Sequence, residues 1–372
     1  MKNKFKILFV VGARPNFVKI ASLLKECKKN KQIETVLVHT GQHYNHEMSK
    51  VFFEELNVIE PDYHFEINGN SHIQQIAEIM LKIEVALQET KPNLVVVVGD
   101  VNSTLAGALA AVKMNIPVAH VEAGLRSFDI SMPEEINRRL VDNVSDFFFI
   151  TESSAFGNLV KEGVDKEKIY LVGNVMIDTL ISLKSKIEKS EILKKLKLKK
   201  KDYAVLTLHR PSNVDDLKEL KEFMDIFGEI QKKIKIVFLV HPRTKIMLQK
   251  LKDYSVENLE MIDSLGYVDC LSLISNSKLV LTDSGGIQEE TTALNIPCLT
   301  LRENTERPIT IKYGTNILCN KKTKILKEID KILKGKQKKA KIPKFWDGKT
   351  SQRIIKIINK KYDSTLVPNK KF

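Results

Sequence analysis

Two groups of residues with side chains suited to catalysis or anion binding follow short apolar segments. In the first half, Glu122 follows the apolar run 118–121, and Glu134 and Arg138 come soon after it. In the second half, the sequence DSGGIQEE at 283–290 follows the apolar run 279–282. Short apolar runs of this kind are typical of parallel strands buried on both faces. Ligands bind beyond the carboxyl ends of such strands, so both groups are candidates for a binding site.

The carboxylates of the first half could move protons. Asp100 and Glu122 each follow an apolar run, where a carboxylate could act as an acid or base. Arginines lie near Glu122 and Glu134 in the sequence, which allows carboxylates to differ in protonation state, as general acid–base catalysis needs. Each has a structural alternative. Asp100 could cap the helix expected after it, and Glu134 could pair with Arg138 four residues later on a helix.

The glycine-rich segment of the second half suits a diphosphate. Ser284, Gly285 and Gly286 would place a hydroxyl and backbone N–H groups at the start of a helix, where an anion is favoured. Glu290 comes one to two turns later and could accept hydrogen bonds from a ribose diol. The alternative is a glycine turn that only reverses the chain.

The loop after the first apolar run carries a basic residue at the start of a helix. It reads GARPNFVK at 12–19, with Arg14 beside a proline that can open a helix. This pattern is neither GxGxxG nor GxxxxGK[ST], which removes support for a nicotinamide cofactor and for a P-loop. We therefore expect no cofactor.

Two histidines in the second half also follow apolar runs. His209 precedes Arg210, and His241 follows the run 234–240. Each could donate a hydrogen bond to phosphate, transfer a proton or cap a helix. Together they could begin a metal site, but no third ligand has a supporting spacing, so we expect no metal.

The elements that position these residues repeat the same order twice. Strands are expected at 5–11, 34–39, 94–98, 118–121 and 147–150, and again at 203–208, 234–240, 259–262, 279–282 and 298–301. Helical periodicity at 17–29, 72–89, 103–113, 217–232 and 286–294 lies between them. This alternation predicts an α/β protein with two Rossmann-like doubly wound domains facing an interdomain cleft. The expected domains are 1–173 and 174–348, with a last helix at about 349–362 packing back on the first.

Composition excludes some classes of protein. No apolar stretch approaches the roughly 18 to 20 residues of a membrane span, and 5–11 is too short for a signal peptide. The four cysteines have no close spacing, which fits reduced thiols in a cytoplasmic protein. The net charge of +14 comes largely from lysine runs such as KKLKLKKK at 194–201, without interleaved aromatics. Such runs favour solubility and general anion attraction over nucleic-acid binding.

The motifs taken together resemble those of a known family. These are GARPNFVK, GD at 99–100, HVEAGLR at 120–126, PEEINR at 133–138, HR at 209–210, DSGGIQEE and TERP at 305–308. In this order, from the first strand to about residue 360, they resemble the non-hydrolysing UDP-N-acetylglucosamine 2-epimerases.

The resemblance implies the glycosyltransferase-B architecture, a UDP-sugar in the interdomain cleft and a homodimer. It also implies reversible epimerisation at C2 of UDP-N-acetylglucosamine, giving UDP-N-acetylmannosamine. The hydrogen at C2 is not adjacent to a carbonyl, so the family eliminates UDP across C1–C2 to 2-acetamidoglucal and then adds it back.

The same resemblance assigns roles to residues that match the family motifs. It implicates Asp100, Glu122 and Glu134 in proton transfer and glycosyl stabilisation. The residues implied to surround the sugar and diphosphate are Arg14, Lys19, Arg138, His209 and Arg210, with His209 also counted among the catalytic candidates. The residues implied to hold phosphates and ribose are Ser284, Gly285, Gly286 and Glu290.

Three departures from the family pattern bear on this assignment. Many bacterial relatives have asparagine where this chain has Arg243 and threonine where it has Val101. The loop at 41–46 differs from the form that builds an allosteric site in some members, so we do not expect allosteric activation.

Other functions remain open from the residues. A modified substrate such as a UDP-2,3-diacetamido uronic acid would use most of the same motifs. A hydrolysing 2-epimerase or a glycosyltransferase of the same fold are further alternatives, and the last would need an acceptor. A non-enzymatic protein that binds UDP-sugar or nucleic acid is the remaining one.

Overall fold

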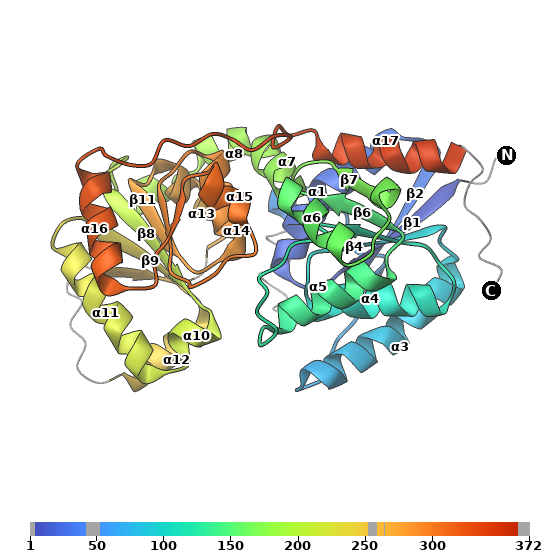
Figure 1. Ribbon diagram of the computed structural model, residues 1–372, viewed down its shortest axis with the longest axis horizontal. Helices are drawn as coiled ribbons and strands as arrows, with labels where there is room; N and C mark the ends of the chain where they lie inside the picture. Colours follow the sequence, from blue (N-terminus) through green and yellow to red (C-terminus); the bar gives the residue numbers. More distant parts are fainter. Residues whose placement is uncertain (1–3, 42–52, 252–258, 264, 364–372) are drawn as a thin grey trace. The chain divides into compact units, whose positions relative to one another are not determined.

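The computed structural model describes residues 4–41, 53–251, 259–263 and 265–363. The chain divides into two compact units, which are described separately. The first contains residues 1–182 and 344–372, and the second contains residues 183–343. Both alternate strands with helices, which confirms the α/β class expected from the sequence (Figure 1).

The first unit is built on a seven-stranded parallel sheet in the order β3-β2-β1-β4-β5-β6-β7. Its strands are β1 (Phe5–Val11), β2 (Ile33–His39), β3 (Tyr63–His64), β4 (Leu94–Val98), β5 (Val118–Val121), β6 (Phe147–Ile150) and β7 (Ile169–Leu171). Its helices are α1 (Arg14–Lys29), α3 (His72–Thr90), α4 (Asn102–Lys113), α5 (Pro133–Val144), α6 (Ser153–Lys161), α7 (Val175–Ser182) and α17 (Thr350–Asp363), with a 3-10 turn η1 (Lys166–Lys168).

Helices cover both faces of this sheet. Alternate residues of a strand point to opposite faces, and Leu8, Val10 and Val97 pack with Ile79 and Ile83 of α3. Helices α4 and α5 continue that layer, while α7 and α17 pack with α1 on the other side of the sheet (Figure 1). The strands, which are rich in β-branched residues, are therefore buried on both faces, as is typical of parallel sheets.

The second unit has a six-stranded parallel sheet in the order β10-β9-β8-β11-β12-β13. Its strands are β8 (Tyr203–Leu208), β9 (Lys235–Val240), β10 (Leu259–Ile262), β11 (Leu279–Thr282), β12 (Cys298–Thr300) and β13 (Asn316–Leu318). Its helices are α8 (Lys184–Lys189), α9 (Ile192–Lys195), α10 (Pro211–Val214), α11 (Leu217–Gln231), α12 (Pro242–Lys250), α13 (Tyr267–Asn276), α14 (Gly285–Ala293), α15 (Pro308–Lys312) and α16 (Lys322–Leu333).

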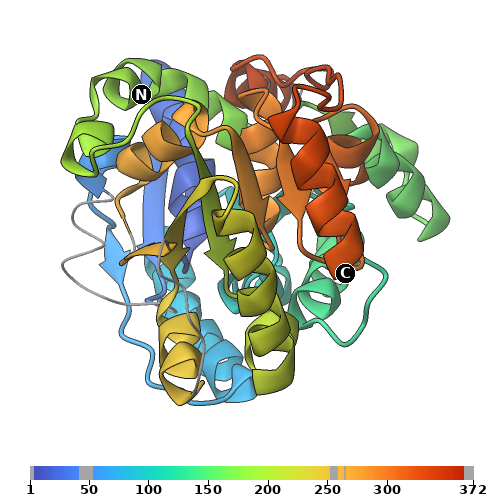
Figure 2. The same ribbon diagram turned by 90° about the vertical axis from the view of Figure 1, so that its left-hand side faces the viewer.

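This second sheet is also covered on both faces. Phe227 of α11 and Ile329 of α16 pack with Leu206 and Phe238. Helices α11 and α16 lie in front of the sheet in Figure 2. The opposite layer joins Tyr203 to residues of α9 and α13. The expected ten strands are all present, with ends within one residue of those predicted.

The strand order reverses at one place in each sheet. In the first unit β1 pairs with both β2 and β4, and in the second β8 pairs with both β9 and β11. The loops that leave two such neighbouring strands diverge to opposite faces and leave room for a ligand between them. These two switch points contain Arg14 and Asp100 in the first unit, and His209 and Ser284 in the second.

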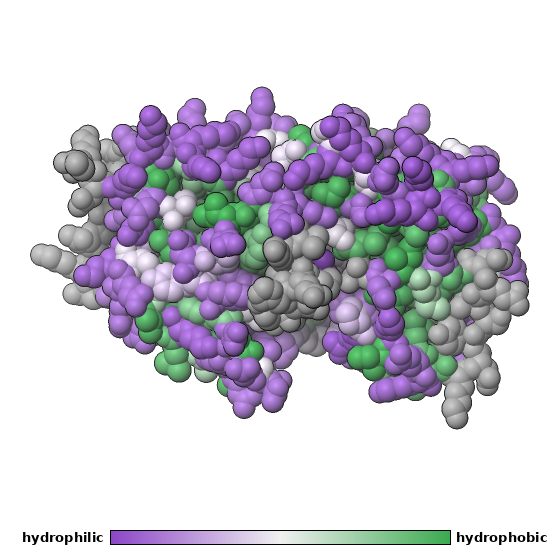
Figure 3. All heavy atoms as spheres, turned by 180° about the vertical axis from the view of Figure 1, so that it is seen from behind, coloured by the Kyte–Doolittle hydropathy of each residue, from purple (hydrophilic) through white to green (hydrophobic). Residues whose placement is uncertain are grey.

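The surface and helix lengths agree with the composition. Figure 3 shows mostly hydrophilic atoms over one face, with scattered hydrophobic ones. In the part of the chain that the structure describes, no helix is long and apolar enough to cross a membrane.

Candidate functional site

Asn16 fixes the loop that follows β1. Its side-chain oxygen accepts hydrogen bonds from the backbone N–H groups of Gly12 (3.2 Å) and Ala13 (3.0 Å). Its side-chain nitrogen donates to the carbonyl of Val98 at the end of β4 (3.0 Å). Asn16 is buried and joins the two loops of this switch point, although it was not among the predicted site residues. Its place in the motif GARPNFVK was the available signal.

Gly99 allows the loop after β4 to turn sharply beside a lysine. Its φ of +73° lies in the left-handed region, where side chains are strained. A Cβ at this position would also lie 3.0 Å from Nζ of Lys19. Glycine is therefore required both for the turn and for the approach of Lys19 to the residues beside it.

Lys19 and Glu122 form a buried ion pair at this end of the sheet. Nζ of Lys19 contacts Oε2 of Glu122, and each residue is only 6% exposed. Glu122 has a φ of +73°, a backbone conformation that costs about 1–3 kcal/mol for a residue with a side chain. Strain of this kind persists where the surroundings hold the residue in place. The predicted residues Lys19 and Glu122 are therefore brought together by the fold.

Arg138 on α5 joins two carboxylates. It pairs with Asp100 through Nη2 and with Glu135 through Nη1, the latter at 2.8 Å. The sequence-based alternative paired Arg138 with Glu134 on the same helix, whereas the structure gives it Glu135, three residues earlier in the chain, and Asp100 on a different loop. Glu134 is partly buried on the same helix.

Glu135 was missed as a site residue. It is fully buried and accepts hydrogen bonds from the backbone N–H (2.8 Å) and hydroxyl (3.0 Å) of Ser127. Burial raises the pKa of Glu135, but these bonds and Arg138 outweigh it and hold the pKa below its usual value. A buried, ionised Glu135 fixes the guanidinium of Arg138. Its burial was not visible in the sequence, where it looks equivalent to Glu134.

In the second unit, Asp283 organises the loop after β8. Its side chain is fully buried and contacts Nδ1 of His209 (2.8 Å). It also accepts from the backbone N–H groups of His209 (2.9 Å) and Arg210 (2.8 Å), and from the side chain of Asn213 (3.1 Å). Burial raises the pKa of Asp283, but His209 and these donors hold it below its usual value. Asp283 thereby orients the His209 ring through Nδ1, and the His209 side chain is 34% exposed.

The start of α14 is arranged for an anion. Ser284 is the residue before the helix, and within the described chain its hydroxyl makes no capping hydrogen bond to it. A Cβ on Gly285 would lie 2.6 Å from Nη1 of Arg307 and 2.8 Å from Oε1 of Glu306. The glycine thus lets an arginine approach the first turn, where N–H groups and the helix dipole already favour negative charge.

Arg307 belongs to a buried cluster of charges beside α14. It pairs with Glu289 (3.1 Å) and with Glu306, and Glu306 also pairs with Arg302 (2.8 Å). Arg210 from the other loop of the switch point lies 3.7 Å from Glu306. The motif TERP at 305–308 was noted in the sequence, but Arg302 and Arg307 were not among the predicted site residues. Three arginines against two glutamates leave a net positive charge at this place.

Glu290, at the far end of its motif, is held by a tyrosine. It is buried, and its Oε1 accepts a hydrogen bond from the hydroxyl of Tyr267 (2.8 Å). Burial raises the pKa of Glu290 to about 7, against a smaller opposite effect of the Tyr267 bond. The carboxyl group is therefore at the border between its neutral and charged forms near neutral pH.

The structure also places two features considered in the sequence analysis, the His209–His241 pair and Arg243. The rings of His209 and His241 lie 5.6 Å apart, and among the described residues no group of three or more His, Cys, Asp or Glu side chains is placed to hold a metal. Arg243 forms an ion pair with Asp215 on the surface. The loop at 41–46, apart from Gly41, lies outside the described residues.

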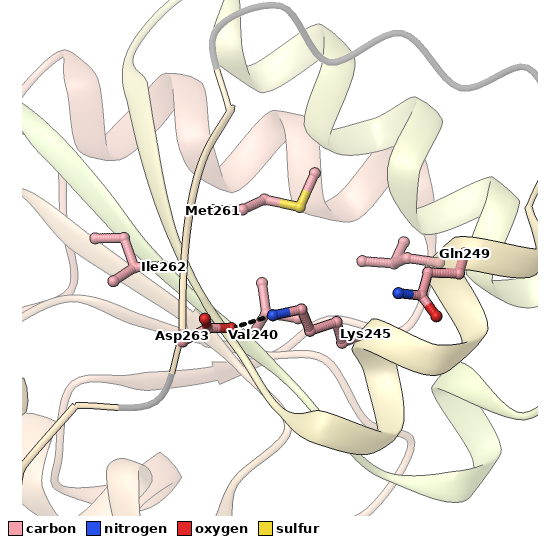
Figure 4. Close-up of a pocket in the computed structure, with 7 residues that line it drawn as sticks. Val240, Lys245, Gln249, Met261, Ile262 and Asp263 are labelled. Atoms are coloured by element: carbon pink, nitrogen blue, oxygen red, sulfur yellow. Dashed lines mark hydrogen bonds and ion pairs between the residues drawn. The ribbon is translucent and has the colours of Figure 1, made fainter.

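A separate hollow of about 280 Å³ lies between α12 and β10. Figure 4 shows Lys245 and Asp263 paired across it, at 2.6 Å, with Met261 and Gln249 on its walls. None of the predicted site residues lines it.

Comparison with known proteins gives consistent matches along the chain. The profile of the family described as UDP-N-acetylglucosamine 2-epimerase matches residues 25–359. A protein of that name from Methanocaldococcus jannaschii is 41% identical, covering 95% of this chain and 98% of its own. A UDP-2,3-diacetamido-2,3-dideoxy-D-glucuronate 2-epimerase from Pseudomonas aeruginosa is 38% identical, covering 95% of this chain and 99% of its own.

A solved structure is similar over the same range. The Methanocaldococcus jannaschii UDP-GlcNAc 2-epimerase in complex with UDP-GlcNAc and UDP gives a TM-score of 0.89 at 41% identity. It covers 95% of this chain and 99% of its own.

Proposed function

The chain belongs to the UDP-N-acetylglucosamine 2-epimerase family, whose members are isomerases, and we propose that it interconverts UDP-N-acetylglucosamine and UDP-N-acetylmannosamine. The observation that carries this proposal is the pair of cation-bound carboxylates in the first unit. Asp100 and Glu122 follow neighbouring strands, and Arg138 and Lys19 hold them. Epimerisation at C2 needs proton transfer on both faces of one carbon, for which two separately held carboxylates are suited.

The proposed reaction is an anti elimination followed by re-addition. A carboxylate removes the proton from C2, its electron pair forms the C1=C2 double bond of 2-acetamidoglucal, and the C1–O bond to UDP breaks. UDP oxygen then attacks C1, and C2 receives a proton on its other face. The atoms balance without an oxidant, so the reaction asks only for acid–base groups and a holder for the departing diphosphate.

We assign proton transfer to Asp100, Glu122 and Glu134, with His209 as a further acid–base candidate. The two paired cations, Lys19 and Arg138, would hold the carboxylates in place and contact the sugar. Arg14, at the start of α1, would also contact the sugar or diphosphate. Positive groups near developing negative charge are a large source of transition-state stabilisation.

The second unit would hold the nucleotide. We assign the phosphates to Ser284, Gly285 and Gly286 at the start of α14, and to Arg210. Nε2 of His209 would donate to the same diphosphate. Glu290 would accept from the ribose hydroxyls. The support is local to this unit: a helix start, a nearby arginine cluster with excess positive charge, and a histidine oriented by Asp283.

The test is conversion of a defined substrate. Purified protein is incubated with UDP-N-acetylglucosamine, and the products are separated by chromatography. We expect an equilibrium mixture with UDP-N-acetylmannosamine from either starting epimer. Accumulation of UDP and free N-acetylmannosamine would show hydrolysis instead, and turnover only with an added acceptor would show a glycosyltransferase. Binding of UDP-sugar without any turnover would contradict the enzymatic proposal.

A second substrate is favoured by the Pseudomonas aeruginosa relative. Its identity of 38% is close to the 41% of the Methanocaldococcus jannaschii protein, at equal coverage of this chain. We therefore propose to compare kcat/KM for UDP-N-acetylglucosamine and for UDP-2,3-diacetamido-2,3-dideoxy-D-glucuronate. A higher value for the second would replace the first as the substrate.

We also propose that the protein is a homodimer. Large apolar side chains lie exposed on α3, where Ile73 is 80% and Leu81 67% exposed, and on α5 at Ile136 and Leu140. Apolar side chains gathered on exposed helices often mark an interface. Sedimentation analysis should give twice the mass of 42.4 kDa, and Leu81→Glu should shift it toward the monomer. A monomeric wild-type protein would contradict the proposal.

A further inference from the structure

His120 lies in β5, two residues before Glu122, and contacts the loop that carries Asp100. It is the third residue of β5 and has no exposed surface. Its Nε2 lies 2.8 Å from the carbonyl oxygen of Gly99, and its Nδ1 lies 2.7 Å from Oδ1 of Asp142 on α5. The ring therefore bridges the loop after β4 and the helix that follows the loop after β5.

Both groups that His120 contacts accept hydrogen bonds. The carbonyl of Gly99 has no proton to give. Asp142 is ionised: its Oδ2 accepts from the backbone N–H of Gly124 (3.0 Å) and pairs with Nη1 of Arg126 (2.7 Å). A neutral imidazole has one N–H only and would leave a lone pair facing one of these acceptors.

We propose that His120 carries a proton on both ring nitrogens and, as a buried cation, acts as a positioning residue for Asp100 and Glu122. The charges around it balance. Asp142 and Glu162 are negative, His120 and Arg126 are positive, and Arg126 joins the two carboxylates through contacts of 2.7 and 2.5 Å. Buried charges persist when they are paired and hydrogen-bonded in this way.

The loops that His120 joins need such support. Gly99 and Glu122 both have φ of +73°. Backbone bonds from Gly99 N–H to the carbonyl of Val121 (3.0 Å) and from Glu122 N–H to that of Phe149 (3.0 Å) are among the other contacts that hold these loops. A shift of about 1 Å in a catalytic group can cost about 100-fold in rate, so a loosened Gly99 would reach the reaction through Asp100. This consequence rests on the proposed function, whereas the protonation state of His120 does not.

The protonation state is tested by nitrogen NMR of the whole protein labelled with ¹⁵N-histidine. At about pH 8, where an unperturbed histidine is neutral, we expect the His120 ring to show two protonated nitrogens. The signal is assigned by its loss in His120→Gln. His39 is an internal control, because burial and the neighbouring His64 lower its pKa to about 4 and keep it neutral. One unprotonated nitrogen in the His120 ring would overturn the proposal.

The positioning role is tested by separating kcat from affinity. His120→Gln keeps a donor for Gly99 and loses the charge. We expect kcat to fall about 100-fold, with KM and the dissociation constant of UDP near wild type, because the proposed nucleotide ligands lie elsewhere. Wild-type kcat, or an equal loss of UDP affinity, would overturn the role.

A second variant keeps the test decisive if His120→Gln does not fold. Asp142→Asn keeps the acceptor for Gly124 and presents an N–H to Nδ1 of His120. We expect its His120 ring to become neutral and kcat to fall less than in His120→Gln. A ring that stays doubly protonated in this variant would overturn the part of the proposal in which Asp142 stabilises the charge of His120. If the wild-type protein has no epimerase activity, the proposed function fails, and the NMR result still decides the state of His120.

Discussion

The two switch points have the same topology and opposite chemistry. In the first unit the loops after β4 and β5 hold carboxylates that face cations on α1 and α5, in the pairs Arg138–Asp100 and Lys19–Glu122. In the second unit the corresponding carboxylate, Asp283, is occupied by His209 and backbone N–H groups. What remains there is a helix start with arginines near it. On the proposed function, one parallel-sheet framework supplies proton-transfer groups in one unit and anion-binding groups in the other.

The charge of the whole units follows the same division. Residues 183–343 contain 33 Lys and Arg against 21 Asp and Glu, whereas the rest of the chain contains 27 against 25. A cationic unit raises the local concentration of a nucleotide diphosphate by its long-range field. Variants in the first unit should therefore lower kcat, whereas variants in the second unit should weaken the affinity for the nucleotide.

The largest expected effect is on turnover in the first unit. Asp100→Asn removes the charge with little change in volume and leaves the second unit intact. We expect kcat to fall about 10²–10⁴-fold, the usual range for loss of an acid–base group, while UDP binds as in wild type by calorimetry. Asp215→Asn, at a surface position paired with Arg243, is the matched control. Turnover close to wild type would remove Asp100 from the proton-transfer set.

The next effect contrasts a carboxyl group of the second unit with those of the first. Glu290 has a pKa raised to about 7 from an ordinary 4.5, so the folded protein bears a cost once this group is charged. The cost is absent below about pH 4.5, grows as pH rises and is complete above about pH 7, where it is on the order of 3 kcal/mol. In urea unfolding, the free energy of unfolding of Glu290→Gln should exceed that of wild type by this amount at about pH 8. At about pH 4 the two free energies should be equal. A difference independent of pH would contradict the assignment.

A smaller effect is expected on affinity in the second unit. Gly285→Ala places a methyl group 2.6 Å from Nη1 of Arg307, which must move. We expect KM and the UDP dissociation constant to rise about 10-fold, roughly 1.4 kcal/mol, with kcat at saturation close to wild type. Gly228→Ala is the control, because a Cβ there meets nothing within 4 Å. A loss confined to kcat would contradict the division between the units.

The smallest effect concerns Arg243, a position at which many bacterial relatives have asparagine. Its guanidinium forms an exposed pair with Asp215, and such pairs contribute roughly 0–1 kcal/mol. Arg243→Asn should therefore change kcat/KM by less than about 5-fold. A larger loss would place Arg243 among the substrate ligands.

Strand positions could be predicted from the sequence because continuous apolar runs such as 94–98 reflect burial on both faces. Short strands at the sheet edges, such as β7 and β13, carry too few residues for a pattern and were not predicted. Residue type alone indicated site candidates such as Glu122, Ser284 and Gly285, and their roles stay predictions. Asn16, Glu135 and Asp283 were missed as site residues because their role depends on burial and on partners distant in sequence.

The most direct test of the central claim follows the hydrogen at C2. Wild-type protein is incubated with UDP-N-acetylglucosamine in deuterated water, and the sugar is observed by proton NMR. The account predicts UDP-N-acetylmannosamine with deuterium at C2, since the proton removed by a first-unit carboxylate is replaced from solvent. Absence of both the new epimer and deuterium at C2 would contradict it.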